Sequence, residues 1–173
     1  MALREIVSVP APVLRRKARK VADFGSELQT LVDDMVETMR QAPGVGLAAP
    51  QIGVPLRLIV VEWHDEEGEA EQEKPPKLYT VLNPEIVRFS QETELGTEGC
   101  LSIPGFVGDV NRATAVTVKG LNRRGQPMRV KADGWLARIF QHEIDHLDGV
   151  LFTDRAEKVW KVEEEVGQVV AAD

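Results

Sequence analysis

Residues 135–149, WLARIFQHEIDHLDG, hold the side chains most able to do chemistry. On a helix, His142 and His146 would lie on one face, one turn apart, so both imidazoles could bind a single metal ion. Glu143 follows the first histidine and could take a proton from a metal-bound water. This HExxH pattern is typical of two metal ligands with a general base. Two of the three histidines fall here among apolar side chains, which predicts a partly buried metal site.

Catalytic sites of this kind take three protein ligands and a water, so a third ligand is needed. Glu163, Glu164 and Glu165 lie downstream, where thermolysin-like proteases place theirs. Cys100 is the other candidate, because a thiolate binds borderline metals strongly. It is the only cysteine, and its flanks, EGCLSIPG, are rich in glycine, which lets a backbone approach a site closely. The residue types alone leave both candidates open.

A third segment, GVGLAAPQIG, runs from Gly44 to Gly53. Small residues followed by Pro50 and Gln51 are unusual for a plain turn. The composition predicts a loop whose backbone lies against a peptide, with the Gln51 amide aimed inward.

Helices and strands must bring these segments together. Apolar residues at helical spacing predict a helix over Ser26–Arg40, ended by Pro43 and Gly44, and another from Asp133 or Gly134 to about Leu147. We expect a third helix over Arg155–Val166. Short apolar or alternating runs predict four strands, over Leu56–Trp63, Tyr79–Phe89 (interrupted at Asn83-Pro84), Ala113–Lys119 and Met128–Lys131, with the last two paired across Asn122–Gly125. This order predicts an α+β fold, with mostly antiparallel sheets packed around the HExxH helix and a helix at the C-terminus.

The 173 residues and 19.2 kDa suit a single domain over residues 1–173. The acidic stretch 62–78 is expected to be a solvated loop insertion, and residues 155–173 a C-terminal helix or tail. With 43% hydrophobic and 28% charged residues the composition is that of a globular protein, and no apolar run is long enough to span a membrane. We therefore expect a cytoplasmic protein that does not bind membranes.

The net charge of the chain is −7. Lysine and arginine cluster only at RRKARK, residues 15–20, so no specific nucleic-acid binding is predicted.

Together the three segments resemble the three motifs of the peptide deformylase family, in the same order. The matching stretches are GxGxAAPQ (Gly44–Gln51), EGCLS (Glu98–Ser102) and QHExDHLxG (Gln141–Gly149). The opening IVSVPAPVLRRKA also resembles the family, so the similarity covers about Glu5 to Asp154. The continuation SIPGFVGD is similar to that of type 1 members, closer to their 1B-like branch.

The resemblance implies a set of site residues. Cys100, His142 and His146 would bind one divalent metal ion, usually Fe(II), with nickel, cobalt or zinc as substitutes. Glu143 would act as general base and acid. The Gln51 amide and the Leu101 backbone N–H would polarise the formyl oxygen, and the backbone of Val45, Gly46 and Gly99 would hold the substrate as an added strand. A supporting ion pair between Glu98 and Arg112 is also implied.

The implied activity is hydrolysis of the N-formyl group from the formyl-methionine of nascent polypeptides, with release of formate. Trp135, Ile139 and Phe106 are candidates for the methionine pocket, and Gln141 and Asp145 for orienting the metal ligands. Transient ribosome association is an expectation that only the RRKARK run could support, because the C-terminal tail is acidic. Two alternatives are an HExxH protease that uses Glu163–Glu165 as its third ligand and an inactive, deformylase-like binding module.

Overall fold

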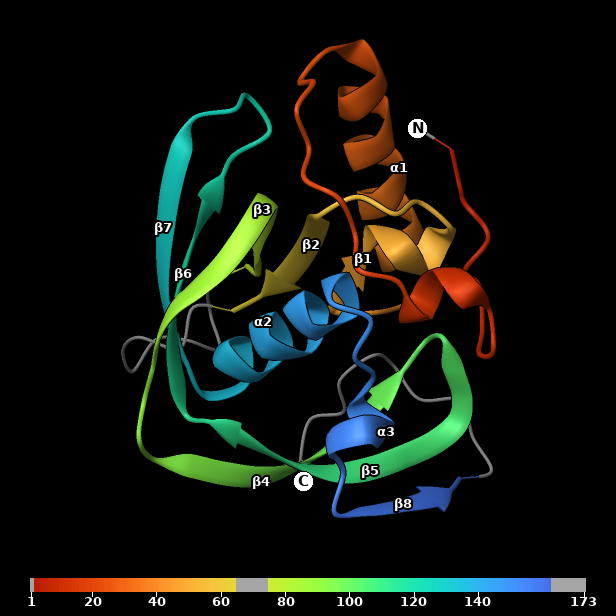
Figure 1. The fold of residues 1–173 in the computed structure, drawn as a ribbon, viewed down its shortest axis with the longest axis vertical. Helices are drawn as coiled ribbons and strands as arrows, with labels where there is room; N and C mark the ends of the chain where they lie inside the picture. Colours follow the sequence, from red (N-terminus) through yellow and green to blue (C-terminus); the bar gives the residue numbers. More distant parts are fainter. Residues whose placement is uncertain (1, 65–74, 163–173) are drawn as a thin grey trace.

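The computed structural model describes residues 2–64 and 75–162, and its elements have the α+β organisation expected (Figure 1). The helices are α1 (Ser26–Gln41), α2 (Gly134–Leu147) and α3 (Phe152–Arg155), with short 3-10 turns η1 (Pro12–Arg15) and η2 (Ala49–Ile52). The strands are β1 (Gly46–Ala48), β2 (Leu58–Trp63), β3 (Lys77–Phe89), β4 (Thr93–Cys100), β5 (Ile103–Ala113), β6 (Ala115–Leu121), β7 (Pro127–Asp133) and β8 (Lys158–Lys161). No helix in these two ranges is long and apolar enough to cross a membrane.

The strands form two antiparallel sheets. One has five strands in the order β1-β2-β3-β6-β7, and the other has three in the order β4-β5-β8. The predicted hairpin is confirmed as β6 and β7, with Val118 opposite Val130. Both sheets therefore owe their order largely to connections between neighbouring strands.

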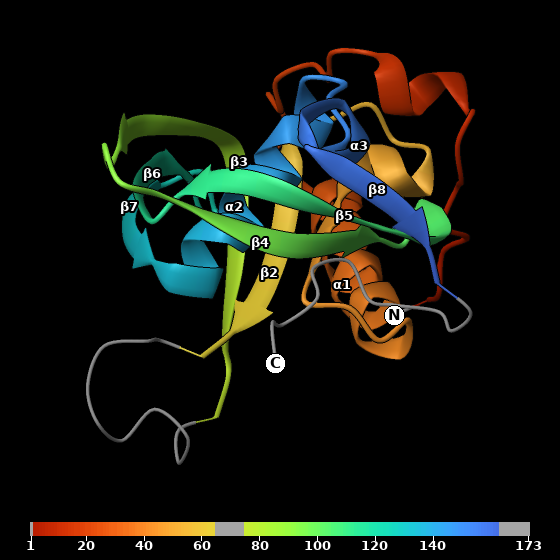
Figure 2. The same cartoon turned by 90° about the horizontal axis from the view of Figure 1, so that it is seen from below.

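Helix α2 lies at the centre of the molecule, between the two sheets (Figures 1 and 2). Alternation along β2 explains how the five-stranded sheet is covered on both faces. Leu58 and Val60 join the cluster built on α1, whereas Ile59 and Val61 join the cluster built on α2. The HExxH helix is thereby buried along most of its length, as its apolar flanks predict.

Three sequence expectations need correction. Strand β3 continues through Asn83 and Pro84, because Asn83 takes a positive φ of 51° at a register shift and its side chain hydrogen-bonds to the backbone of Val21. Strands β4 and β5 were not predicted. The helix expected over Arg155–Val166 is wrong over its first half, because Lys158–Lys161 form β8.

Strand β8 pairs with the edge of β5, where Trp160 lies opposite Val107. The alternating sequence KVWK suits a strand, and an open sheet edge is available to it. The C-terminal helix of the described chain is instead the four-residue α3, which ends at Arg155. Glu163–Glu165 and most of the acidic stretch 62–78 lie outside the described residues.

Candidate metal centre

Helix α2 carries three of the predicted site residues. His142, Glu143 and His146 are at most 2% exposed. The helix begins directly after β7, at Gly134, whose φ of 58° is accessible to glycine without strain. Because α2 packs on the five-stranded sheet, these polar groups are held inside the protein, where each must find a partner.

Strand β4 brings the third predicted ligand to the helix. Cys100 ends β4 and is 1% exposed, and one side-chain atom from each of Cys100, His142 and His146 lies within 4.8 Å of the others. The Cys100 Sγ to His146 Nε2 distance is 3.4 Å. Two ligands bound tetrahedrally to one metal at usual bond lengths would lie roughly 3.6 Å apart. The group therefore has the spacing of a metal site.

The ring of His142 is also oriented to bind a metal. His142 Nδ1 is 2.8 Å from Oε1 of Glu98, which leaves Nε2 as the ligating atom. His142 Nε2 is buried and has no hydrogen-bond partner among residues 2–64 and 75–162. A soft thiolate, two imidazoles and a buried nitrogen in need of a partner together fit a divalent transition metal.

Glu98 is fully buried and ionised. Burial by itself would raise the pKa of Glu98, but hydrogen bonds from Arg112 and His142 outweigh it and hold that pKa well below its usual range. Arg112 donates to both carboxylate oxygens of Glu98 at 2.9 Å, so the predicted Glu98–Arg112 ion pair is present. This carboxylate gives the centre a permanent negative charge next to His142.

The two histidines are electrostatically unequal in the metal-free protein. Burial lowers the pKa of His142, but interactions with the Cys100 and Glu98 side chains and the charge of Glu143 override it and raise that pKa to about 10. Burial and the positive charge of His142 lower the pKa of His146. A metal ion would have to displace the proton on His142, since metal ligands must be deprotonated.

The glycine loop closes over this centre. A Cβ on Gly46 would lie 2.6 Å from Oε2 of Glu143, and one on Gly44 would lie 3.1 Å from Cδ1 of Leu101. Glycine at these positions therefore lets the loop touch both other motifs. All three sequence motifs converge on one place, as predicted.

Gln51 points into the same centre from η2. It is fully buried, and its Nε2 lies 3.6 Å from Cys100 Sγ and 3.2 Å from Ser102 Oγ. Its Oε1 accepts a hydrogen bond from Ala48 N at 3.0 Å, which fixes which end of the amide donates. The inward-facing amide expected from the sequence is confirmed.

The residues predicted to hold a peptide lie at sheet edges. Gly46 is in β1, which ends the five-stranded sheet, and Gly99 is in β4, which ends the three-stranded sheet. Val45 directly precedes β1, and its carbonyl accepts from Glu62 N. Among the described strands, β1 pairs only with β2 and β4 only with β5. Each therefore has an edge at which an extended peptide could add.

The residues predicted to orient the metal ligands or to form the methionine pocket differ in their contacts. Asp145 binds Arg112 at 2.6 Å and is thereby linked to His142 through Arg112 and Glu98. Gln141 binds the backbone of Ala113 and contacts no ligand by hydrogen bond in the described chain. Trp135 lines a cavity, whereas Ile139 is fully buried and Phe106 is 40% exposed.

Sequence reasoning missed two residues that contact the site. Arg138 binds Glu98 at 2.7 Å, and the Phe152 ring stacks on His142 with centroids 6.2 Å apart. Arg138 could have been noticed, because it precedes His142 by four residues and so shares its helix face. Phe152 offered no such signal, since it lies beyond the end of α2.

Comparison with known proteins agrees with this site. The family model for polypeptide deformylase matches residues 3–162. A peptide deformylase of Symbiobacterium thermophilum is 53% identical over 165 residues, covering 95% of this chain and 72% of that protein. One of Natranaerobius thermophilus is 48% identical over 164 residues, covering 95% and 99%.

Solved structures give the same result. The peptide deformylase of Thermotoga maritima matches with a TM-score of 0.81 and 38% identity, covering 91% of this chain and all 100% of that one. That of Synechococcus elongatus, in complex with actinonin, matches with a TM-score of 0.79 and 41% identity, covering 90% and 79%. The chain therefore belongs to the polypeptide deformylase family, whose members are metal-dependent hydrolases.

Proposed function

We propose that Cys100, His142 and His146 bind one divalent metal ion, Fe(II) in the cell, and that this centre removes the formyl group from N-formyl-methionyl peptides. The observation that carries the proposal is the convergence of these three ligand atoms within 4.8 Å, beside Glu143. When bound, such an ion lowers the pKa of a coordinated water toward ~7 and so supplies a nucleophile at neutral pH. Nickel, cobalt or zinc could occupy the same donor set.

Glu143 is the residue proposed to move the proton. It neighbours His142 in sequence and is fully buried against Gly46, so its carboxylate is shielded from bulk water. It would take the proton of the attacking water and then give it to the leaving nitrogen. The products would be formate and a peptide with a free amino terminus.

Gln51 and Leu101 are proposed to stabilise the negative charge that develops on the formyl oxygen. The Gln51 Nε2 already donates into the centre, 3.6 Å from Cys100 Sγ. Leu101 follows Cys100 directly, and its backbone N–H would be the second donor. Removing one donor of this kind typically costs about 3 kcal/mol of transition-state stabilisation.

The peptide is proposed to bind as an extra strand between Gly46 and Val45 on one side and Gly99 on the other. Backbone hydrogen bonds would give affinity with little dependence on sequence. That suits an enzyme that acts on many nascent chains. Trp135 remains our candidate for contact with the methionine side chain. The single-domain organisation, the cytoplasmic location and transient contact with the ribosome stay predictions.

Formate release tests the activity. Protein purified without oxygen should release formate from a formyl-Met-Ala-Ser tripeptide but release no acetate from the acetyl-Met analogue. Metal content measured on the same sample should be close to one ion per chain. Bound metal without formate, on folded protein, would contradict the proposed activity and favour the binding module.

A further inference from the structure

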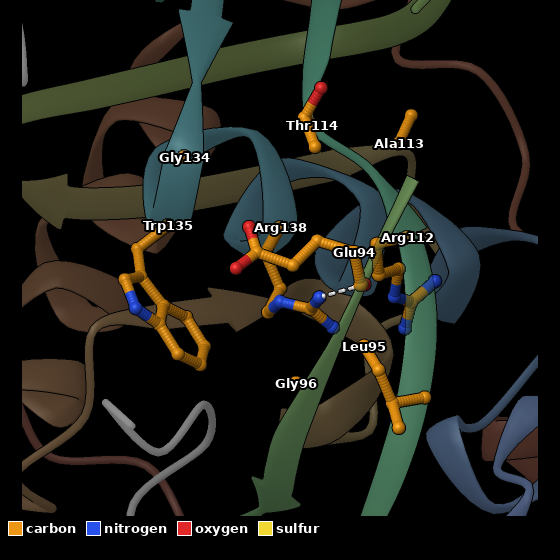
Figure 3. Close-up of a pocket in the computed structure, with 9 residues that line it drawn as sticks. All are labelled: Glu94, Leu95, Gly96, Arg112, Ala113, Thr114, Gly134, Trp135 and Arg138. Atoms are coloured by element: carbon orange, nitrogen blue, oxygen red, sulfur yellow. Dashed lines mark hydrogen bonds between the residues drawn. The ribbon is translucent and has the colours of Figure 1, made fainter. Parts of the chain in front are cut away.

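We propose that Arg138 is a positioning residue for the metal centre, which holds Glu98 in place so that Glu98 in turn aims His142 at the metal. The proposal rests on the proposed metal centre. Arg138 is 5% exposed and lies on α2, facing β4 (Figure 3). Arginine stays protonated and offers no lone pair to a metal, so Arg138 is not a ligand, and its bond to Glu98 is its link to the centre.

Arg138 is held on several sides. Its guanidinium donates to Glu98 Oε2 at 2.7 Å, to the Val110 carbonyl at 2.8 Å and to the Glu94 carbonyl at 2.6 Å. Its Cζ also lies 5.3 Å from the centre of the Trp135 ring. A guanidinium fixed in this way presents its donor to Glu98 in one geometry.

Arg138 supplies the second guanidinium that contacts Glu98. Its Oε1 accepts from Arg112 and His142, and its Oε2 accepts from Arg112 and Arg138. Arg112 is shared with Asp145, whereas Glu98 is the only carboxylate paired with Arg138 among residues 2–64 and 75–162. Arg138 is therefore the anchor dedicated to Glu98.

The spacing of the two facing elements explains this arrangement. Gly96, Glu98 and Cys100 alternate along β4 and so lie on one face, with a repeat of roughly 6.6 Å. Arg138, His142 and His146 lie on one face of α2, with a repeat of about 6 Å. The two repeats nearly match, so Arg138 meets Gly96 and Glu98, His142 meets Glu98, and His146 meets Cys100.

Gly96 provides independent support. A Cβ on this residue would lie 2.7 Å from Arg138 Cζ, so a larger residue here would force the guanidinium out of its observed position. Strand β4 is thus fitted to Arg138 as well as to the metal ligands. Alanine at this position would displace the guanidinium without removing its charge.

The test measures metal affinity, because it does not require turnover. Apo protein is titrated with Co(II) in competition with a chelator, and the d–d absorption of bound Co(II) is recorded. Arg138→Gln and Gly96→Ala should each raise the Co(II) Kd by about tenfold or more, the effect typical of losing a group that orients a ligand. Arg57→Gln is the matched control, because Arg57 pairs with Asp148 and is not bonded to Glu98. It should leave the Kd unchanged.

A double variant separates positioning from general stability. In a Glu98→Gln background, Arg138→Gln should change the Kd by less than about twofold, because its effect passes through Glu98. Unchanged Kd values in folded Arg138→Gln and Gly96→Ala, or the full effect retained in the Glu98→Gln background, would overturn the proposal. If Arg138→Gln does not fold, Gly96→Ala decides. Failure of the wild-type protein to bind Co(II) would instead contradict the metal centre itself.

Discussion

Side chains of ordinary type acquire special roles in this molecule through burial and a few fixed neighbours. His142 lies between Glu98, which fixes one ring nitrogen, and Phe152, which stacks on the ring face. Its other nitrogen is then left to the metal. The same logic applies to Gln51, whose amide is oriented by Ala48.

Cys100→Ala separates the deformylase from the alternative HExxH protease. The variant should lose metal binding by more than about 100-fold, because a thiolate ligand is removed from a three-ligand site. A protease using Glu163–Glu165 would keep its metal. Metal content after dialysis distinguishes the two outcomes, and circular dichroism confirms that the variant is folded.

The two histidine ligands and the general base were predictable from residue types and spacing, since His142 and His146 must share a helix face, whereas the choice of Cys100 as third ligand needed the family resemblance. Arg112 could be assigned only through the family resemblance. The spacing of Arg138 to His142 places it on the ligand face of α2, but its partner Glu98 could not be predicted, because that contact arises from the match between a strand repeat and a helix repeat. That match appears only once β4 is placed beside α2.

Helices and strands with a regular repeat of apolar residues were predicted correctly, and those without one were not. Helices α1 and α2 and the β6–β7 hairpin have clear apolar periods and were predicted within a few residues. Strands β4 and β5, with the sequences TELGTEGC and IPGFVGDVNRA, lack alternation because glycines and polar residues serve the site. Strand β8 is too short for its alternating pattern to distinguish a strand from the helix that was predicted there.

Helix α3 supports the metal centre through Phe152, which is 2% exposed and packs with Cys100, Ile103 and Leu151. Phe152→Ala should lower the free energy of unfolding by about 3–5 kcal/mol, as for other buried phenylalanines. Urea denaturation of the metal-free protein measures this loss.

Phe106→Ala is the control for this prediction, because Phe106 is 40% exposed on β5. It should lower stability clearly less than Phe152→Ala does, because part of its ring is already exposed to water. Equal effects of the two substitutions would contradict the view that α3 is part of the core around His142.

Considered as a whole, the molecule is a helix enclosed by two sheets, with an N-terminal segment fastened along the outside. That segment is joined to α1 at Asp34, which accepts hydrogen bonds from Ala2 N at 2.7 Å and from Arg4 Nε at 2.9 Å. These bonds, with the backbone bond the larger cause, lower the pKa of Asp34 from 3.8.

Because the folded pKa lies below the unfolded value, this contact stabilises the fold fully above the unfolded pKa and is lost as the pH falls through the folded pKa. Asp34→Asn should therefore be less stable than wild type at pH 7, and the difference should shrink as the pH drops below about 4. Thermal unfolding at several pH values tests this.

The measurement that bears most directly on the account compares Glu143→Ala with wild type in anaerobic, iron-loaded protein. Formate release from formyl-Met-Ala-Ser is recorded at equal metal content. We expect one metal ion per chain in both proteins and a fall in kcat of about 100-fold or more in the variant, the contribution typical of a positioned general base. A metal-replete variant that releases formate at near the wild-type rate would contradict the central claim.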